Sequence, residues 1–176
     1  MQSSDKFYVE PKKEVASVAV VHDNKILMMQ RRDNDRWTLP GGHLDEKEDP
    51  KEGAKRELKE EAGIEANKLK KLGTKEVKTF TGKEMKIHAF IYEPKEKPKF
   101  TAKNDPDREA KTYKWVDMEN FPEDIKHNLH SPRNVVLEKL GILKSLLTKS
   151  LGFDLFKSRT HKYIRKYKRG GKWVVS

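Results

Sequence analysis

Apolar runs alternate with charged segments along this chain, and their spacing predicts strands on both sides of one strong helix. The runs Val15–Val21 and Lys25–Arg31 flank the turn residues His22-Asp23-Asn24, which predicts a β-hairpin. Further elements are expected after the hairpin: strands at 37–39, 69–79, 86–92 and 113–116, a charged loop at 95–108 and a second helical stretch over 121–147. Strands before and after the strong helix favour a mixed α and β fold over a helical bundle.

The strong helix is predicted at Pro50–Ala62 from signals at both of its ends. Asp49 is a good N-cap residue, and Pro50 suits the first helical position because it has no N–H to leave unpaired. Glu52 stands three residues after the cap, as in a capping box. Gly63 is the residue type that most often ends a helix, so we expect the helix to stop there.

The distribution of charge divides the chain into segments, and the absence of cysteine excludes several kinds of site. The chain has 176 residues, a length that suits one domain, with 38% charged residues and a net charge of +11. Residues 149–176 hold nine of the 39 lysines and arginines but one of the 28 acids. We therefore divide the chain into a lead-in at 1–14, a domain at 15–148 and a basic extension at 149–176. Having no cysteine excludes a disulfide scaffold, a thiolate nucleophile and cysteine-ligated metal sites.

The sequence gives no sign of a membrane segment. Apolar runs stay well short of the roughly 18 residues that a membrane-spanning helix needs. Residues 1–14 lack the apolar core of a secretory signal. We expect a protein without a membrane partner, located in the cytoplasm.

Three carboxylates lie on one face of the predicted helix. Glu57, Glu60 and Glu61 are spaced i, i+3 and i+4, about one helical turn apart. Like charges so placed repel each other unless a cation lies between them, and oxygen donors of this kind suit Mg²⁺ or Mn²⁺. A solvated acidic face on a surface helix has the same spacing, so the spacing alone leaves both interpretations open.

The wider pattern around the helix is more specific. Residues 42–64 read G-x5-E-x7-R-E-L-x-E-E-x-G-I. This segment resembles the Nudix box, the signature of the Nudix hydrolases, at every fixed position. The resemblance implies an α/β/α sandwich around a mixed β-sheet, and it does not cover the basic C-terminal extension.

The resemblance also implies the site. Its metal ligands would be Glu57, Glu60 and Glu61, with the carbonyl of Gly41, and the ion would be Mg²⁺ or possibly Mn²⁺. Glu60 and Glu61 would be catalytic, Arg56 would orient the site through Glu48, and two glycines would be structural, Gly42 and Gly63. The implied reaction is attack of a metal-activated water on the pyrophosphate linkage of a nucleoside diphosphate joined to a further group, in a nucleoside triphosphate, a nucleotide sugar or a similar substrate.

Other candidate residues lie outside the box. Glu109 falls where the family often has a later acid, and it is either the general base or an ordinary loop acid. Three arginines crowd near the expected mouth of the site and either bind phosphates or belong to a solvated loop: Arg31, Arg32 and Arg36. Four further residues could contact the substrate, but each of these residue types more often has a structural role: His43, His88, Trp37 and Phe80.

The basic extension leaves the partners open. Within residues 157–176, cations alternate with Tyr163, Tyr167 and Trp173, a pattern that suits nucleic acid or an acidic partner. A solubilising tail or a terminal β-hairpin around Gly170-Gly171 are the alternatives. Besides the small-nucleotide hydrolase, two functions stay open: an RNA 5′-end pyrophosphohydrolase or decapping-type enzyme that uses the tail, and a non-catalytic nucleotide-binding protein. The sequence assigns no oligomeric state.

Overall fold

A computed structural model describes residues 12–78, 82–101, 105, 108–129, 136–137, 141, 154–157, 163–169 and 172–175. Within the first 129 residues, the elements alternate much as the apolar pattern predicts. They are β1 (Lys13–His22), β2 (Lys25–Arg31), β3 (Trp37–Thr38), α1 (Pro50–Ala62), β4 (Lys70–Lys78), β5 (Glu84–Tyr92), β6 (Ala110–Asp117) and α2 (Glu123–His127). None of the described helices is long and apolar enough to cross a membrane.

Six of the described strands form one mixed sheet, which is the framework of the domain. Its strands run in the order β3-β2-β1-β5-β4, and β6 pairs with β2. The β1–β5 pair is parallel, whereas the other pairs are antiparallel. The hairpin β1–β2 turns at Asp23 and Asn24, both with positive φ, as a tight hairpin turn requires. The sheet is therefore mixed, and the predicted hairpin is confirmed.

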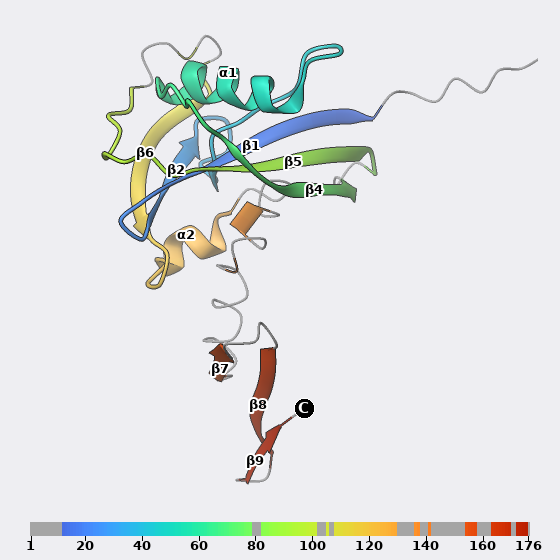
Figure 1. The fold of residues 1–176 in the computed structure, drawn as a ribbon, viewed down its shortest axis with the longest axis vertical. Helices are drawn as coiled ribbons and strands as arrows, with labels where there is room; N and C mark the ends of the chain where they lie inside the picture. Colours follow the sequence, from blue (N-terminus) through green and yellow to red (C-terminus); the bar gives the residue numbers. More distant parts are fainter. Residues whose placement is uncertain are drawn as a thin grey trace, which may run out of the picture.

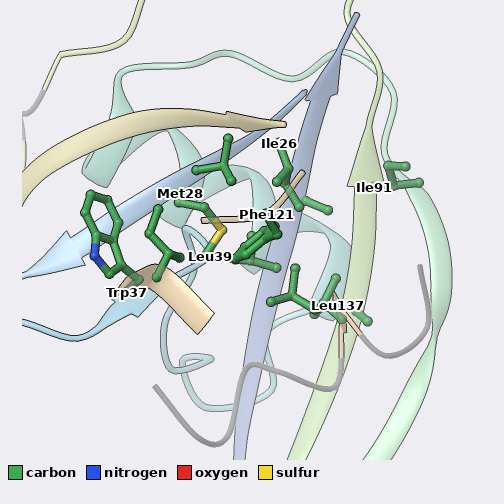
Figure 2. Close-up of a cluster of buried hydrophobic side chains, with 12 residues drawn as sticks. Ile26, Met28, Trp37, Leu39, Ile91, Phe121 and Leu137 are labelled. Carbon is green, nitrogen blue, oxygen red and sulfur yellow. The ribbon is translucent and has the colours of Figure 1, made fainter. Parts of the chain in front are cut away.

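Helices cover both faces of the sheet, with α1 on one face and α2 on the other (Figure 1). Successive residues of β1 alternate between the two cores: Ala16, Val18 and Val20 pack with Leu58 of α1, and Ala19 packs in the cluster beneath α2. This second cluster gathers side chains far apart in the chain, as Figure 2 shows for Trp37, Leu39, Met28, Phe121 and Leu137. The sandwich implied by the sequence is confirmed.

Most predicted boundaries agree with the structure within two residues, and two predicted segments differ by more. Strand β6 begins at Ala110 rather than at residue 113, because backbone pairing with β2 continues past the apolar residues that marked the strand in the sequence. Of the predicted helical stretch over 121–147, the structure describes α2 and a helical pair at 136–137, and most of the remaining residues lie outside the described ranges. Phe80 also lies outside them.

The described residues of the basic extension form three antiparallel strands, β7 (Asp154–Lys157), β8 (Tyr163–Arg169) and β9 (Lys172–Val175), with β8 in the middle. Strands β8 and β9 pair antiparallel from Arg169↔Lys172 to Lys166↔Val175. The hairpin alternative for the tail therefore agrees with the strand pairing.

Candidate active site

The site begins with a glycine loop that runs beside β1. The carbonyls of Pro40 and Gly42 accept hydrogen bonds from the backbone N–H groups of Val18 and Ala16, each at 2.9 Å. Gly41 lies between them, and its N–H donates to Oε2 of Glu61 at 2.6 Å. The loop is thus fixed to the sheet on one side and to helix α1 on the other.

Both loop glycines are required by close approach. Gly41 has φ +138°, and a Cβ at this position would lie 2.1 Å from the carbonyl oxygen of Ala16. A Cβ on Gly42 would lie 2.4 Å from Oε1 of Glu57. Because neither residue has a side chain, α1 packs close enough for its carboxylates to reach the loop.

Local signals fix the ends of α1 as the sequence predicts. The Asp49 side chain accepts hydrogen bonds from the N–H groups of Lys51 and Glu52, and Gly63 adopts the left-handed conformation that ends the helix. Leu58 is fully buried against the sheet. The helix therefore turns its acidic side toward the glycine loop.

Arg56 joins the acidic residues into one network. Its Nε and Nη2 each lie 2.9 Å from the carboxylate oxygens of Glu48, a two-bonded pairing. Its Nη1 donates to Glu57 at 3.1 Å and to Glu60 at 3.0 Å. Hydrogen bonding by Arg56 lowers the pKa of Glu48, and the same bond raises the pKa of Arg56. The pairing of Arg56 with Glu48 that the resemblance implies is present in the structure.

The donor set suits a hard divalent cation, although the described residues do not form a closed cage. Among them, no three acidic, histidine or cysteine side chains converge on one point. Arg56 lies between Glu57 and Glu60, and the carboxylate of Glu61 bonds to Gly41, so these acids are paired with internal partners. Glu61 is only 4% exposed, and a buried carboxylate needs such partners.

Glu109 and Arg31, two further candidates, contact each other. Nη1 of Arg31 donates to the Glu109 carboxylate at 2.8 Å, and Arg31 forms two more bonds of 2.9 Å with Asp33. Hydrogen bonding to Asp33, together with the charge of Glu109, raises the pKa of Arg31. The candidate base and a candidate phosphate ligand therefore lie together where β2 ends and β6 begins.

The other two arginines differ in their surroundings. Arg32 donates from Nε to the carbonyl of Arg108 and from Nη2 to that of Ala110, each at 3.1 Å. Arg36 is exposed in the turn between β2 and β3, where its N–H bonds to Asn34.

The weaker candidates have structural partners. Trp37 is 9% exposed within the cluster beneath α2. The carbonyl of His43 accepts a hydrogen bond from Arg56. His88 is buried, and its Nε2 lies 2.6 Å from Oε2 of Glu14, which lowers the pKa of that carboxylate.

The structure also adds a residue that sequence reasoning missed. The hydroxyl of Tyr113 donates to the backbone carbonyl of Glu61 at 2.5 Å. Burial, with the charges of Glu61 and Asp105, raises the pKa of Tyr113, so the hydroxyl keeps its proton. The two residues are 52 positions apart in the chain, and only the strand pairing of β6 brings them together.

A mixed sheet between two helical layers, with a glycine loop beside β1 and an acidic helix on one face, is the arrangement of a Nudix-type protein. The family model described as the NUDIX domain matches residues 12–140. The chain therefore belongs to the Nudix hydrolase family, whose members act on pyrophosphate bonds of nucleotide derivatives.

Individual relatives agree with this assignment. The chain is 34% identical over 128 residues to an RNA pyrophosphohydrolase of Bartonella quintana, covering 63% of this chain and 74% of that protein. It is 48% identical over 50 residues to a MutT-like protein of Streptomyces ambofaciens, a match that spans 28% of this chain and 32% of that relative's length. The crystal structure of a MutT NUDIX hydrolase from Burkholderia pseudomallei has the same fold, with a TM-score of 0.63 and 20% identity over 74% of this chain and 99% of that one.

Proposed function

We propose that this protein is a divalent-metal-dependent hydrolase that cleaves the pyrophosphate linkage of a nucleoside diphosphate joined to a further group. The observation that carries the proposal is the acidic network on α1, where Glu57 and Glu60 meet Arg56 and Glu61 meets the glycine loop. Membership of the Nudix family supports the reaction class.

The ion is Mg²⁺, with Mn²⁺ as the alternative, because carboxylate and carbonyl oxygens are the donors that both prefer. Glu57, Glu60 and Glu61 would hold it with the carbonyl of Gly41. When bound, such an ion neutralises phosphate charge and lowers the pKa of a coordinated water. Arg56 and Glu48 keep the carboxylates in position.

Glu109 is the proposed general base. Its carboxylate is 37% exposed and is held by Arg31, so it is both oriented and open to solvent. Arg31 is engaged by Asp33 and Glu109, and Arg32 by the carbonyls of Arg108 and Ala110, so phosphate binding falls mainly to the exposed Arg36.

A release assay tests this function. Phosphate and nucleoside monophosphate are measured after incubation with nucleoside triphosphates, ADP-ribose, nucleotide sugars, dinucleoside polyphosphates and 5′-triphosphorylated RNA, with Mg²⁺, with Mn²⁺ and with a chelator. We expect metal-dependent turnover of at least one class, lost in Glu57→Gln. Silence across the panel would favour the non-catalytic nucleotide-binding alternative.

RNA is a second candidate substrate, favoured by the similarity to the Bartonella RNA pyrophosphohydrolase. A 5′-triphosphate on RNA has the same phosphoanhydride bond, and the basic extension offers cations and aromatic residues for the chain that follows. In the sequence of β8, Arg165 and Arg169 share the period-two pattern of Tyr163 and Tyr167, whereas Lys166 and Lys168 stand at the alternate positions.

This alternation provides a matched test. One double variant replaces Arg165 and Arg169 by Ala, and the other replaces Lys166 and Lys168 by Ala, so each removes two positive charges. If RNA binds at the positions that alternate between arginine and tyrosine, the arginine variant loses more activity on 5′-triphosphorylated RNA, and neither variant changes the turnover of small nucleotides. Equal losses on both kinds of substrate would argue against a role for the tail in binding RNA.

A further inference from the structure

Glu61 is held at both of its ends. Its carboxylate accepts the N–H of Gly41 at 2.6 Å, and its backbone carbonyl accepts the hydroxyl of Tyr113 at 2.5 Å. The first contact fixes the side chain against the glycine loop, and the second fixes the backbone against β6. A residue restrained in this way has little freedom to shift relative to either neighbour.

The second contact belongs to a wider clamp on the last turn of α1. The last carbonyls of a helix have no partner within the helix. Here the N–H of Thr101 donates to the carbonyl of Ala62 at 2.9 Å, and the N–H groups of Gly63 and Ile64 bond to carbonyls of Lys59 and Leu58. The turn that carries Glu60 and Glu61 is thus tied to the β5–β6 loop and to β6.

Tyr113, which makes this contact, is itself held in strand β6. Tyr113 pairs with Met29 in the register between β6 and β2, and its ring packs against Phe100 with centroids 5.2 Å apart. Glu109, the proposed base, directly precedes the same strand. A shift of β6 would therefore move both the last turn of α1 and Glu109.

We propose that Tyr113 is a positioning residue for the reaction. The hydroxyl of Tyr113 holds the backbone of Glu61 in place. The carboxylates of the last helical turn are thereby kept at the distance from the glycine loop that metal binding and catalysis need. The inference rests on the proposed function, since it assigns Tyr113 a part in that same reaction.

Tyr92 provides a matched control. Its hydroxyl also donates to a backbone carbonyl, that of Glu65 at 3.4 Å, and its ring packs in the same core beneath α1. Glu65 lies beyond the helix, outside the catalytic turn. Replacing either tyrosine by Phe removes one hydroxyl and leaves the ring.

The test compares Tyr113→Phe with Tyr92→Phe in the full chain. Steady-state hydrolysis is measured on the best substrate of the panel, and Mn²⁺ affinity is measured by electron paramagnetic resonance without substrate. We expect Tyr113→Phe to lower kcat about tenfold and to weaken Mn²⁺ binding about fivefold with KM within about twofold, because small displacements of catalytic groups are costly to the rate. Tyr92→Phe should match the wild type.

The outcomes separate the two proposals. Wild-type protein that neither turns over any substrate nor binds Mn²⁺ would overturn the proposed function. If the wild type is active, a Tyr113→Phe variant that keeps its kcat and its Mn²⁺ affinity would overturn the role of Tyr113 alone. Equal losses in the two variants would also overturn it, since they would reflect a general loosening of the core. A folded fraction measured by circular dichroism corrects each rate for unfolded protein.

Discussion

Gly41 and Gly42 are adjacent, but they need to be glycine for different reasons. At Gly41, a Cβ would collide with backbone atoms of Ala16 and Ser17 in β1, which cannot move aside without disturbing the sheet. The residue also has φ +138°, a conformation that favours glycine. At Gly42, the obstacle is the carboxylate of Glu57, the end of a flexible side chain. The first glycine is therefore required by the fold and the second by the site.

Alanine substitutions should separate these two reasons. We expect Gly41→Ala to lower the free energy of unfolding by about 3 kcal/mol, through backbone strain and overpacking. Gly42→Ala should cost less than about 1 kcal/mol in stability but lower kcat about tenfold, because Glu57 must move. Chemical denaturation and steady-state assays measure both effects.

Gly82 is the control for this pair. It has φ +78°, and a Cβ there would meet nothing within 4 Å. Gly82→Ala should therefore show the cost of positive φ alone, without loss of activity. Equal losses of stability at Gly41 and Gly42 would contradict the distinction.

The pair formed by Glu14 and His88 links stability to pH. The pKa of Glu14 is lowered from its ordinary value of 4.5, chiefly by the hydrogen bond to His88 and also by Lys86. A carboxylate whose pKa is lower in the folded state stabilises the fold above its unfolded pKa, and this contribution is lost as pH falls through the folded pKa. We expect Glu14→Gln to lower the free energy of unfolding by about 1 kcal/mol at pH 7 and by much less at pH 3.

Denaturant titrations at the two pH values measure this difference. Glu65→Gln is the control, because Glu65 pairs with Lys59 on the surface, with both side chains well exposed. It should change stability little at either pH. A Glu14→Gln cost that is the same at pH 3 and pH 7 would show that the ionised carboxylate does not stabilise the fold.

At the scale of single elements, helix α1 was predictable because its signals are local. Asp49, Pro50 and Gly63 lie at its ends in sequence as in structure, and the spacing of the glutamates places them on one face. By contrast, the contact of Tyr113 with Glu61 and that of His88 with Glu14 depend on strand register. The register of the strands brings together two residues that are 52 positions apart in the first pair and 74 positions apart in the second. The sequence contains no local signal for that register.

The N-cap of α1 can be tested separately from its chemistry. The Asp49 side chain accepts two backbone hydrogen bonds at the start of the helix, about two turns before Glu57, the first of the proposed metal ligands. We expect Asp49→Ala to lower the free energy of unfolding by about 1 kcal/mol and Asp49→Asn to lower it by only a few tenths. Both variants should keep the kcat of the wild type.

The kcat should not change because the cap bonds only to N–H groups of the first turn of α1. The carboxylates of the proposed site are held by contacts at the last turn and by Arg56. Thermal unfolding and steady-state assays on the two variants check the expectation. A loss of kcat in Asp49→Asn, which retains a capping oxygen, would mean that the charge at the cap contributes to the reaction.

At the scale of the whole molecule, the two larger hydrophobic clusters of the described residues lie on opposite faces of the sheet. The core beneath α1 supports the helix that holds the proposed metal ligands, and the core beneath α2 covers the opposite face of the sheet (Figure 1). Ile125 in α2 and Leu58 in α1 are both fully buried. Truncating either side chain leaves a cavity of similar size in a different core.

We expect Ile125→Ala and Leu58→Ala each to lower the free energy of unfolding by about 2 to 4 kcal/mol. Only Leu58→Ala should also lower kcat once rates are corrected for the folded fraction, because it loosens the helix that carries the carboxylates. Denaturation curves and assays well below the unfolding temperature measure this. A matching loss of kcat in Ile125→Ala would show that the site depends on both cores.

The measurement that most directly tests the central claim compares the wild type, Glu60→Gln, Glu61→Gln and Glu52→Gln on the best substrate of the panel. Glu52 lies on the same helix and pairs with Lys55 on the surface, so its variant removes one carboxylate outside the network. We predict metal-dependent hydrolysis by the wild type and Glu52→Gln, with losses of at least about a hundredfold in Glu60→Gln and Glu61→Gln. Full activity in the Glu60→Gln and Glu61→Gln variants would contradict the account.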